Sequence, residues 1–188
     1  LMQAVHSDDE ASNVRALPRR PRALVLVPTR ELSSQVADVA RHVGRALRLS
    51  VAAVHGGTSA APQRKMLERP VDVLVATPGR LLQLLDSASV YLGDVRHVVI
   101  DEVDTMLEAG FGDELDRLLA ITTRDLSTDT RAASKAAAGL AAGHVQHVAV
   151  GATHPASALE LYAKRLPAAR HLMLDGVHSV PPTLRQRF

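Results

Sequence analysis

A parallel α/β fold, a sheet covered by helices, is predicted from two features of the 188-residue sequence. Short apolar runs rich in β-branched residues alternate with longer stretches in which apolar residues recur at helical spacing. The strand-like runs are 23–27, 51–54, 71–75, 98–100 and 148–150. Strands that alternate with helices in this way form parallel sheets, because each helix carries the chain back to the edge where the previous strand began.

Two helices are predicted between these strands. The apolar face of the first consists of residues three or four positions apart: Leu32, Val36, Val39, Val43 and Leu47. Thr29 is the expected cap of this helix. The second helix begins at Thr77-Pro78, a capping residue followed by proline at the first helical position, and its leucines are expected in the core.

Composition limits the classes of protein that the chain can belong to. Forty-six per cent of the residues are hydrophobic, no cysteine is present, and 22 basic residues against 20 acidic ones give a net charge of +2. This predicts one globular domain without disulfides. Every apolar run is far shorter than the roughly 20 residues of a membrane-spanning helix, so no membrane partner is expected. We expect an intracellular protein, with a mitochondrion or another organelle as the alternative.

Three segments depart from the alternation. Residues 7–22 are polar and end in Pro18-Arg19-Arg20-Pro21-Arg22, which predicts an exposed basic loop. Residues 122–143 are rich in Ala, Ser and Thr, and their composition is compatible with a helical insertion or a mobile loop, either a docking site for a partner or a tolerated surface loop. The last residues lose all pattern.

Three carboxylates follow the fourth strand-like run. Val98–Ile100 leads directly into Asp101 and Glu102, and Asp104 follows after Val103. Ligands of open parallel sheets lie beyond the carboxyl ends of the strands, so these acids are candidates for Mg²⁺ binding and for activation of a water. The alternative is structural: Asp101 or Asp104 simply caps the helix that follows.

Two other strand ends have the residues of an anion site. Pro28-Thr29-Arg30 and Thr77-Pro78-Gly79-Arg80 each place a threonine and an arginine where a helix begins, and Gly56-Gly57 follows the strand between them. Free backbone N–H groups and the helix dipole attract phosphate there, and arginine adds a charged fork. A simple helix cap is the alternative for either site alone. With only two Tyr and two Phe in the chain, a nucleic acid would be bound by its backbone rather than by base stacking.

In order and spacing, these motifs resemble the first RecA-like domain of DEAD-box RNA helicases. The matching residues are Pro28-Thr29-Arg30-Glu31-Leu32 (motif Ia), Gly56-Gly57 (GG motif), Thr77-Pro78-Gly79-Arg80 (motif Ib), Asp101-Glu102-Val103-Asp104 (motif II) and Gly151-Ala152-Thr153 (motif III). The resemblance covers nearly the whole chain. It implies a RecA-like parallel sheet flanked by helices, part of a P-loop NTPase domain.

The resemblance implies a role for each motif. Asp101 would hold Mg²⁺ through water, and Glu102 would activate the water that attacks the γ-phosphate of ATP. Asp104 would link this site to motif III, Gly151-Ala152-Thr153, which would couple ATP hydrolysis to unwinding. The RNA backbone would be bound without sequence preference by Pro28, Thr29, Arg30, Gly56, Gly57, Thr77, Pro78, Gly79 and Arg80.

It also implies a domain organisation. Residues 1–179 would form the first RecA-like domain without its N-terminal phosphate-loop part, because the fingerprint G-x-x-x-x-G-K-[ST] is absent from these residues. The likeness of Leu1–Ala4 to the end of the helix after that loop favours a loop upstream; loss of the loop is the alternative. Residues 180–188 would begin the linker to a second RecA-like domain, and we expect the 188 residues alone to be inactive.

Two residues depart from the family pattern. Val103 stands where the family has alanine, which leaves all three carboxylates in place. Gly151 stands where motif III usually begins with serine, so a hydroxyl near Asp104 is missing, and this predicts partial uncoupling of ATP hydrolysis from unwinding.

The expected function is that of an ATP-dependent RNA helicase, which uses ATP and Mg²⁺ to remodel RNA or a ribonucleoprotein. Ribosome biogenesis is the expected process, with a ribosomal or other ribonucleoprotein assembly as the partner. The alternative is a structural RNA-binding assembly factor that keeps the helicase-like fold and no longer hydrolyses ATP.

Overall fold

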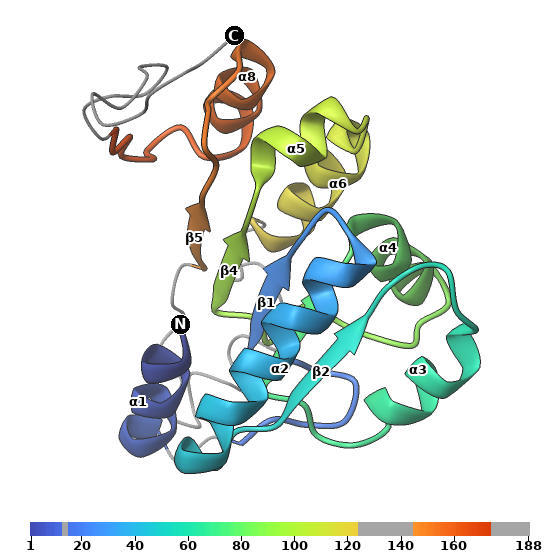
Figure 1. Ribbon diagram of the computed structural model, residues 1–188. Coiled ribbons are helices and arrows are strands. Elements are labelled where there is room, and N and C mark those ends of the chain that lie inside the picture. The colour runs from blue at the N-terminus through green and yellow to red at the C-terminus, as the bar shows by residue number, and fades with distance from the viewer. Residues whose placement is uncertain (13–14, 124–144, 174–188) are drawn as a thin grey trace, which may run out of the picture.

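A five-stranded parallel sheet is the centre of the computed structural model, which describes residues 1–12, 15–123 and 145–173 (Figure 1). The strands are β1 (Ala23–Leu26), β2 (Val51–Val54), β3 (Val73–Ala76), β4 (His97–Ile100) and β5 (Gln146–Ala149), in the order β2-β3-β1-β4-β5. The predicted fold class is confirmed. Each strand lies on one of the predicted apolar runs, with bounds moved by at most two residues.

Helices cover both faces of the sheet. They are α1 (Met2–Ser12), α2 (Arg30–Leu47), α3 (Ala60–Leu67), α4 (Pro78–Asp86), α5 (Val103–Glu108), α6 (Gly112–Thr122) and α8 (Ala156–Arg165). Alternate residues of β1 face opposite sides: Ala23 and Val25 pack with α1 and α2, whereas Leu24 and Leu26 pack with the other helices. The described residues contain no helix with the length and apolar character needed to cross a membrane.

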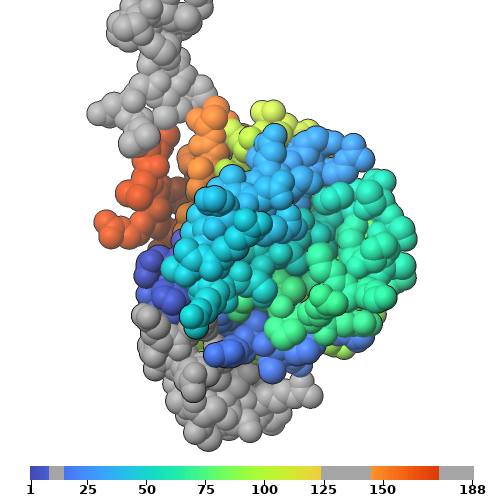
Figure 2. Space-filling model, turned by 60° about the horizontal axis from the view of Figure 1, so that its bottom comes forward, coloured from blue at the N-terminus to red at the C-terminus, as the bar shows by residue number. Residues whose placement is uncertain are grey.

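The predicted apolar face of α2 is wrong in part. Val39 is 67% exposed and Val43 is 43% exposed, on the side of α2 that forms much of the face in Figure 2. The residues buried against the sheet are instead small: Ser33, Ala37 and Gly44. At Gly44 the helix approaches the following loop so closely that a Cβ would lie 2.9 Å from the carbonyl oxygen of Leu49. The position of α2 is therefore determined by close backbone contact rather than by a stripe of large apolar side chains.

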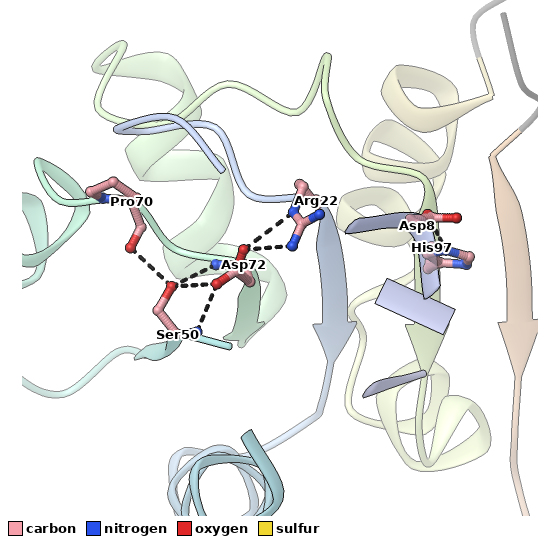
Figure 3. Close-up of polar contacts among 6 residues, drawn as sticks. All are labelled: Asp8, Arg22, Ser50, Pro70, Asp72 and His97. Carbon is pink, nitrogen blue, oxygen red and sulfur yellow. Dashed lines mark hydrogen bonds and ion pairs between the residues drawn. The ribbon is translucent and has the colours of Figure 1, made fainter. Parts of the chain in front are cut away.

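The predicted basic loop is also not simply exposed. Arg22 is only 6% exposed, and its Nη2 donates to Oδ1 of Asp72 at 2.7 Å (Figure 3). The other oxygen of Asp72, Oδ2, accepts from the amide and the hydroxyl of Ser50, at 2.7 and 2.8 Å. This cluster lies where β1 and β3 begin, so it stabilises the edge of the sheet opposite to the predicted motifs.

Two predicted segments lie wholly or almost wholly outside the described residues. The alanine-rich segment 122–143 lies outside the described residues, except that Thr122 and Thr123 end and cap α6. Residues 180–188, expected to begin a linker, lie outside them as well.

Candidate functional site

All the predicted motifs lie at one edge of the sheet, because the strands are parallel and end in register. Leu26 pairs with Ala76 on one side and with Ile100 on the other. The order of strands then places the motifs along this edge as Gly56-Gly57 after β2, Thr77–Arg80 after β3, Pro28–Arg30 after β1, Asp101–Asp104 after β4 and Gly151–Thr153 after β5. The phosphate-binding candidates thus occupy one half of the edge and the carboxylates the other.

Asp101 and Glu102 turn the chain out of β4. The amide of Asp101 donates to the carbonyl of Leu26 at 2.9 Å, as if the strand continued, and its Oδ1 accepts from the amide of Glu102 at 3.0 Å. Glu102 then adopts a left-handed conformation, φ 51° and ψ 49°. That conformation costs a non-glycine residue about 1–2 kcal/mol, and strained residues of this kind concentrate at functional sites. It leaves the Glu102 side chain exposed at the edge.

The structure does not support the alternative that these acids cap a helix. The residue before the first turn of α5 is Glu102, and no side chain caps that end of the helix. The carboxylate of Asp101 accepts from the amide of its own neighbour, and Asp104 lies inside the first turn. No other described residue donates a hydrogen bond to the second oxygen of Asp101, so within this part of the chain that oxygen is available to a ligand beyond the strand.

Asp104 turns away from the edge and binds motif III. It is 8% exposed, and its Oδ2 accepts from the amide of Thr153 at 2.8 Å and from the hydroxyl of Thr153 at 2.9 Å. Burial raises the pKa of this carboxyl, but the hydrogen bonds from Thr153 and Thr105 outweigh burial, so the pKa lies below its ordinary value. Asp104 is held as a carboxylate that joins α5 to the loop after β5.

Gly151 lies directly against this carboxylate. A Cβ at Gly151 would be 3.0 Å from Oδ1 of Asp104 and 3.0 Å from the carbonyl oxygen of Thr153. The hydroxyl of a serine here would be close enough to donate to Asp104, but the neighbours would have to move by a few tenths of an ångström to admit it. Val103, the other departure, is fully buried in the core, where its methyl groups are accommodated.

Behind motif III the half-buried His154 packs against the buried Tyr162, a contact that the sequence did not indicate. The two rings meet edge to face with centroids 6.0 Å apart, and within the described part of the chain neither the buried Nδ1 atom of His154 nor the buried Oη atom of Tyr162 has a hydrogen-bond partner. Burial, and then the charge of Asp104, raise the pKa of Tyr162 to about 12. No local sequence pattern indicates this contact, because the sequence around Tyr162 is that of an ordinary core-facing position in α8.

In the other half of the edge, the predicted residues divide into buried and exposed ones. Thr77, Pro28 and Pro78 are buried, so these residues shape the loops. Thr29 caps α2, since its Oγ1 accepts from the amide of Leu32 at 3.1 Å. Thr77 precedes α4 and makes no side-chain cap.

Arg30 reaches toward the glycine loop after β2. Its guanidinium pairs with Glu31, with Nη2 2.8 Å from Oε1, and the Arg30 side chain is 53% exposed. A Cβ at Gly57 would lie 3.2 Å from Nη1 of Arg30, so motif Ia and the GG motif are in contact. Gly57 has φ +77°, which glycine adopts without strain.

Arg80 is bound to the protein itself. Its Nη2 donates to the carbonyl of Thr58 at 2.8 Å and its Nε to Oε1 of Gln83 at 3.1 Å. Nη1 of Arg80 is buried without a partner. In this arrangement Arg80 connects α4 to the glycine loop, and it is less free to reach a ligand than Arg30.

The carboxylates do not converge into a metal site made by protein alone. Among the described residues, no three His, Asp or Glu side chains come together closely enough to hold a metal ion. An oxygen ligand such as Asp101 suits Mg²⁺, which keeps several waters and takes its other ligands from substrate phosphates. The residues present therefore fit a Mg²⁺ ion that arrives with a nucleotide.

Known proteins share both the sequence and the fold. The family model of the DEAD/DEAH box helicase matches residues 5–161. DEAD-box ATP-dependent RNA helicase 39 of Arabidopsis thaliana is 33% identical over 189 positions, which cover 100% of this chain and 28% of that protein. The chloroplastic DEAD-box ATP-dependent RNA helicase 3A of Zea mays is 41% identical over 63% of this chain and 15% of its own length.

Two solved structures have a similar architecture. A hypothetical ATP-dependent RNA helicase from Sulfolobus tokodaii matches with a TM-score of 0.65 and 31% identity over 79% of this chain and 39% of its own. The yeast DEAD-box splicing factor Prp28 matches with a TM-score of 0.66 and 28% identity over 77% of this chain and 30% of its own. The chain thus spans well under half of the length of each of these relatives. On the family match and the RecA-like sheet together, the chain belongs to the DEAD/DEAH box helicase family.

Proposed function

We propose that this chain is the part of an ATP-dependent RNA helicase of DEAD-box type that carries the hydrolytic carboxylates and one half of the RNA-binding surface. The observation that carries the proposal is the division of one sheet edge between two groups of loops: the carboxylates after β4 with the Gly151–Thr153 loop after β5, and the candidate phosphate-binding loops after β1, β2 and β3. In such an arrangement a nucleotide and an RNA backbone would bind beside adjacent strands of the same sheet.

The acidic half has carboxylates of the kind that ATP hydrolysis uses to orient Mg²⁺ and to activate water. Mg²⁺ bound with ATP would neutralise the charge on the phosphates. Asp101 would orient that ion through water from its place at the end of β4. The exposed carboxylate of Glu102 would accept a proton from the attacking water. Asp104 would transmit a movement of this site to Thr153 through the two hydrogen bonds between them.

The other half would bind RNA through its backbone. Within the described residues, no hydrogen bond uses the amide N–H of Gly56 or Gly57, and a Cβ at Gly56 or Gly79 would meet no atom within 4 Å. Open N–H groups, the N-termini of α2 and α4 and the exposed fork of Arg30 suit successive phosphates. Contacts of this kind carry no base specificity.

A second candidate is an ATPase-inactive RNA-binding assembly factor. Gly151 is the observation in its favour, because the loop after β5 lacks a hydroxyl that would add a fourth donor to Asp104, beside the amide of Thr105 and the amide and hydroxyl of Thr153. This candidate keeps the RNA contacts and loses turnover.

The proposed substrate is a ribosomal or other ribonucleoprotein RNA inside the cell, with an organelle as the alternative compartment. One structural neighbour is named a splicing factor, which supports a ribonucleoprotein, and one relative is named chloroplastic, which supports an organelle.

The deciding measurement is ATP hydrolysis by the full-length protein with and without RNA. We expect RNA to stimulate turnover and Glu102→Gln to abolish it while RNA binding remains. Glu108→Gln makes the same change of charge at an exposed position of the same short helix and should leave turnover intact. RNA binding without any hydrolysis would favour the assembly factor, and absence of RNA binding would overturn both.

A further inference from the structure

The loop from His55 to Ser59, which carries Gly56 and Gly57, is held from two sides by side chains outside it. On one side is Gln63 of α3, and on the other is Arg80 of α4. Neither interaction follows from the motif that the loop contains. Together they determine where the two glycines and their unused N–H groups lie.

Gln63 uses both ends of its amide on this loop. It is 8% exposed. Its Oε1 accepts from the amide of His55 at 3.2 Å, and its Nε2 donates to the carbonyl of His55 at 3.1 Å and to the hydroxyl of Thr58 at 2.9 Å. The side chain therefore ties the start of the loop, where β2 ends, to its far end, just before α3.

Arg80 holds the same residue that Gln63 holds. The hydroxyl of Thr58 accepts from Gln63, and the carbonyl of Thr58 accepts from Nη2 of Arg80 at 2.8 Å. Thr58 is thus fixed through its side chain and its backbone. Gly57, the residue before it, has φ +77° and lies against Arg30. The loop could not keep this conformation by its own sequence, because glycine restricts the backbone least of all residues.

We propose that Gln63 is a positioning residue for RNA binding: it presents the N–H groups of Gly56 and Gly57 to the RNA backbone without touching RNA itself. This inference rests on the proposed function. A glycine loop without an anchor would have to be ordered each time RNA binds, and that entropic cost would weaken affinity. Gln63 lowers this cost before RNA arrives.

The test is the affinity of the full-length protein for a fluorescent single-stranded oligo(U) RNA across a range of salt concentrations. Gln63→Leu approximately keeps the size of the side chain and removes the hydrogen bonds that Gln63 makes to the loop, while the bond from Arg80 to Thr58 remains. We expect affinity to fall on the order of tenfold, as for the loss of one to two hydrogen bonds, with no change in the slope of log affinity against log salt. Loss of a phosphate contact would instead flatten that slope by about 0.7.

Gln63→Glu provides a second readout that a residue needed only for folding would not give. The carboxylate that this substitution introduces cannot donate to Thr58 or to the carbonyl of His55, whereas its protonated form regains one donor. Affinity relative to the wild type at the same pH should therefore recover as pH falls. The wild-type reference corrects for any effect of pH on RNA binding that does not involve residue 63, including effects through the two ionisable side chains that contact the same loop, those of His55 and Arg80.

Gln3→Glu adds the same charge at an exposed position of α1 and is the matched control for long-range repulsion of RNA. Full affinity of both Gln63 variants, a flattened salt slope, or a deficit of Gln63→Glu that does not change with pH would overturn the positioning role. Failure of the wild-type protein to bind the RNA would overturn the proposed function instead. If Gln63→Leu does not fold, the pH dependence of Gln63→Glu decides the question.

Discussion

Thr153 donates both its amide and its hydroxyl hydrogen to a single oxygen of Asp104, at 2.8 and 2.9 Å, across a sequence separation of 49 residues. Asp104 lies in the first turn of α5, which follows β4, and Thr153 lies in the loop after the neighbouring strand β5. Since Asp104 lies two positions after the exposed Glu102, any movement of the acidic loop acts directly on the loop after β5. This pair is a direct physical path between the proposed hydrolytic site and motif III.

Gly151→Ser and Gly151→Ala separate the effect of the missing hydroxyl from that of added bulk. Both variants place a Cβ about 3.0 Å from Oδ1 of Asp104, and only serine adds a donor to that carboxylate. We expect Gly151→Ser to increase the number of RNA strands separated per ATP hydrolysed, and Gly151→Ala to leave this ratio unchanged or lower it. The measurement is duplex unwinding and ATP hydrolysis by the full-length protein in the same reaction.

An equal increase in strands separated per ATP in both variants would show that backbone rigidity, rather than the hydroxyl, determines how well hydrolysis is coupled to unwinding. No gain in Gly151→Ser would remove Gly151 as the cause of any uncoupling. Thermal unfolding of both variants shows whether the close approach to Asp104 has been accommodated.

Arg80→Ala is expected to weaken RNA binding by more than the loss of one charge. The guanidinium donates to the carbonyl of Thr58, so its removal frees the glycine loop in addition to removing a positive group near the RNA. Arg80→Lys keeps the charge and loses the planar fork. We expect the alanine variant to flatten the dependence of affinity on salt and the lysine variant to lose affinity at an unchanged slope. An unchanged slope in Arg80→Ala would assign Arg80 to the loop alone.

The sharing of one sheet edge by the motifs could be predicted, because it depends on patterns that persist over the chain, whereas their order along that edge follows from the strand order that the fold shows. Five apolar runs specify the strands, and parallel strands bring every carboxyl end to one edge. The exposure of Val39 and Val43 could not be predicted in this way. Periodicity identifies the helix, but the face that packs was decided by the close approach at Gly44, which is a tertiary relationship.

The side chains of the site that could not be predicted share one property: their partners are distant in sequence or reached only through the fold. Gln63 looks like an ordinary polar residue of a short helix, and its partners His55 and Thr58 are recognised only when the folded loop before α3 brings them to its side chain. Arg80 belongs to a recognisable motif, yet its partner Thr58 lies 22 residues earlier. Buried polar contacts between distant segments leave no local signature, so the sequence indicates the ligands of a site more readily than the residues that position them.

Asp104 should contribute to stability at neutral pH and lose that contribution in acid. Its pKa is raised by burial but lowered further by the hydrogen bonds from Thr153 and Thr105, so it is lower in the folded chain than in the unfolded one. A group of this kind stabilises the fold above its unfolded pKa, about 3.9, and ceases to do so as pH falls through the lower folded value. Asp104→Asn should therefore cost about 1.5 kcal/mol or more at neutral pH and progressively less below pH about 4.

Chemical denaturation of wild type and variant across this range of pH measures the difference. Asp38→Asn is the control, because the Asp38 side chain is 75% exposed and pairs with Arg41 one turn away on the same helix. A cost of Asp104→Asn that stays constant into acid would show that the carboxylate charge is not what Thr153 recognises.

Tyr162→Phe is expected to leave the protein as stable as before or to stabilise it by about 1 kcal/mol, because the buried hydroxyl of Tyr162 has no partner to lose. The stability of Tyr162→Phe relative to the wild type should increase further at alkaline pH. The pKa of Tyr162 is raised by burial and by Asp104 to about 12, so stability that is present below the unfolded value of about 10 is lost as pH rises toward the folded one. Tyr91→Phe, at a residue that is 42% exposed, is the control and should change neither the stability at neutral pH nor its dependence on alkaline pH. Destabilisation by Tyr162→Phe would show that the hydroxyl binds a partner in the folded protein.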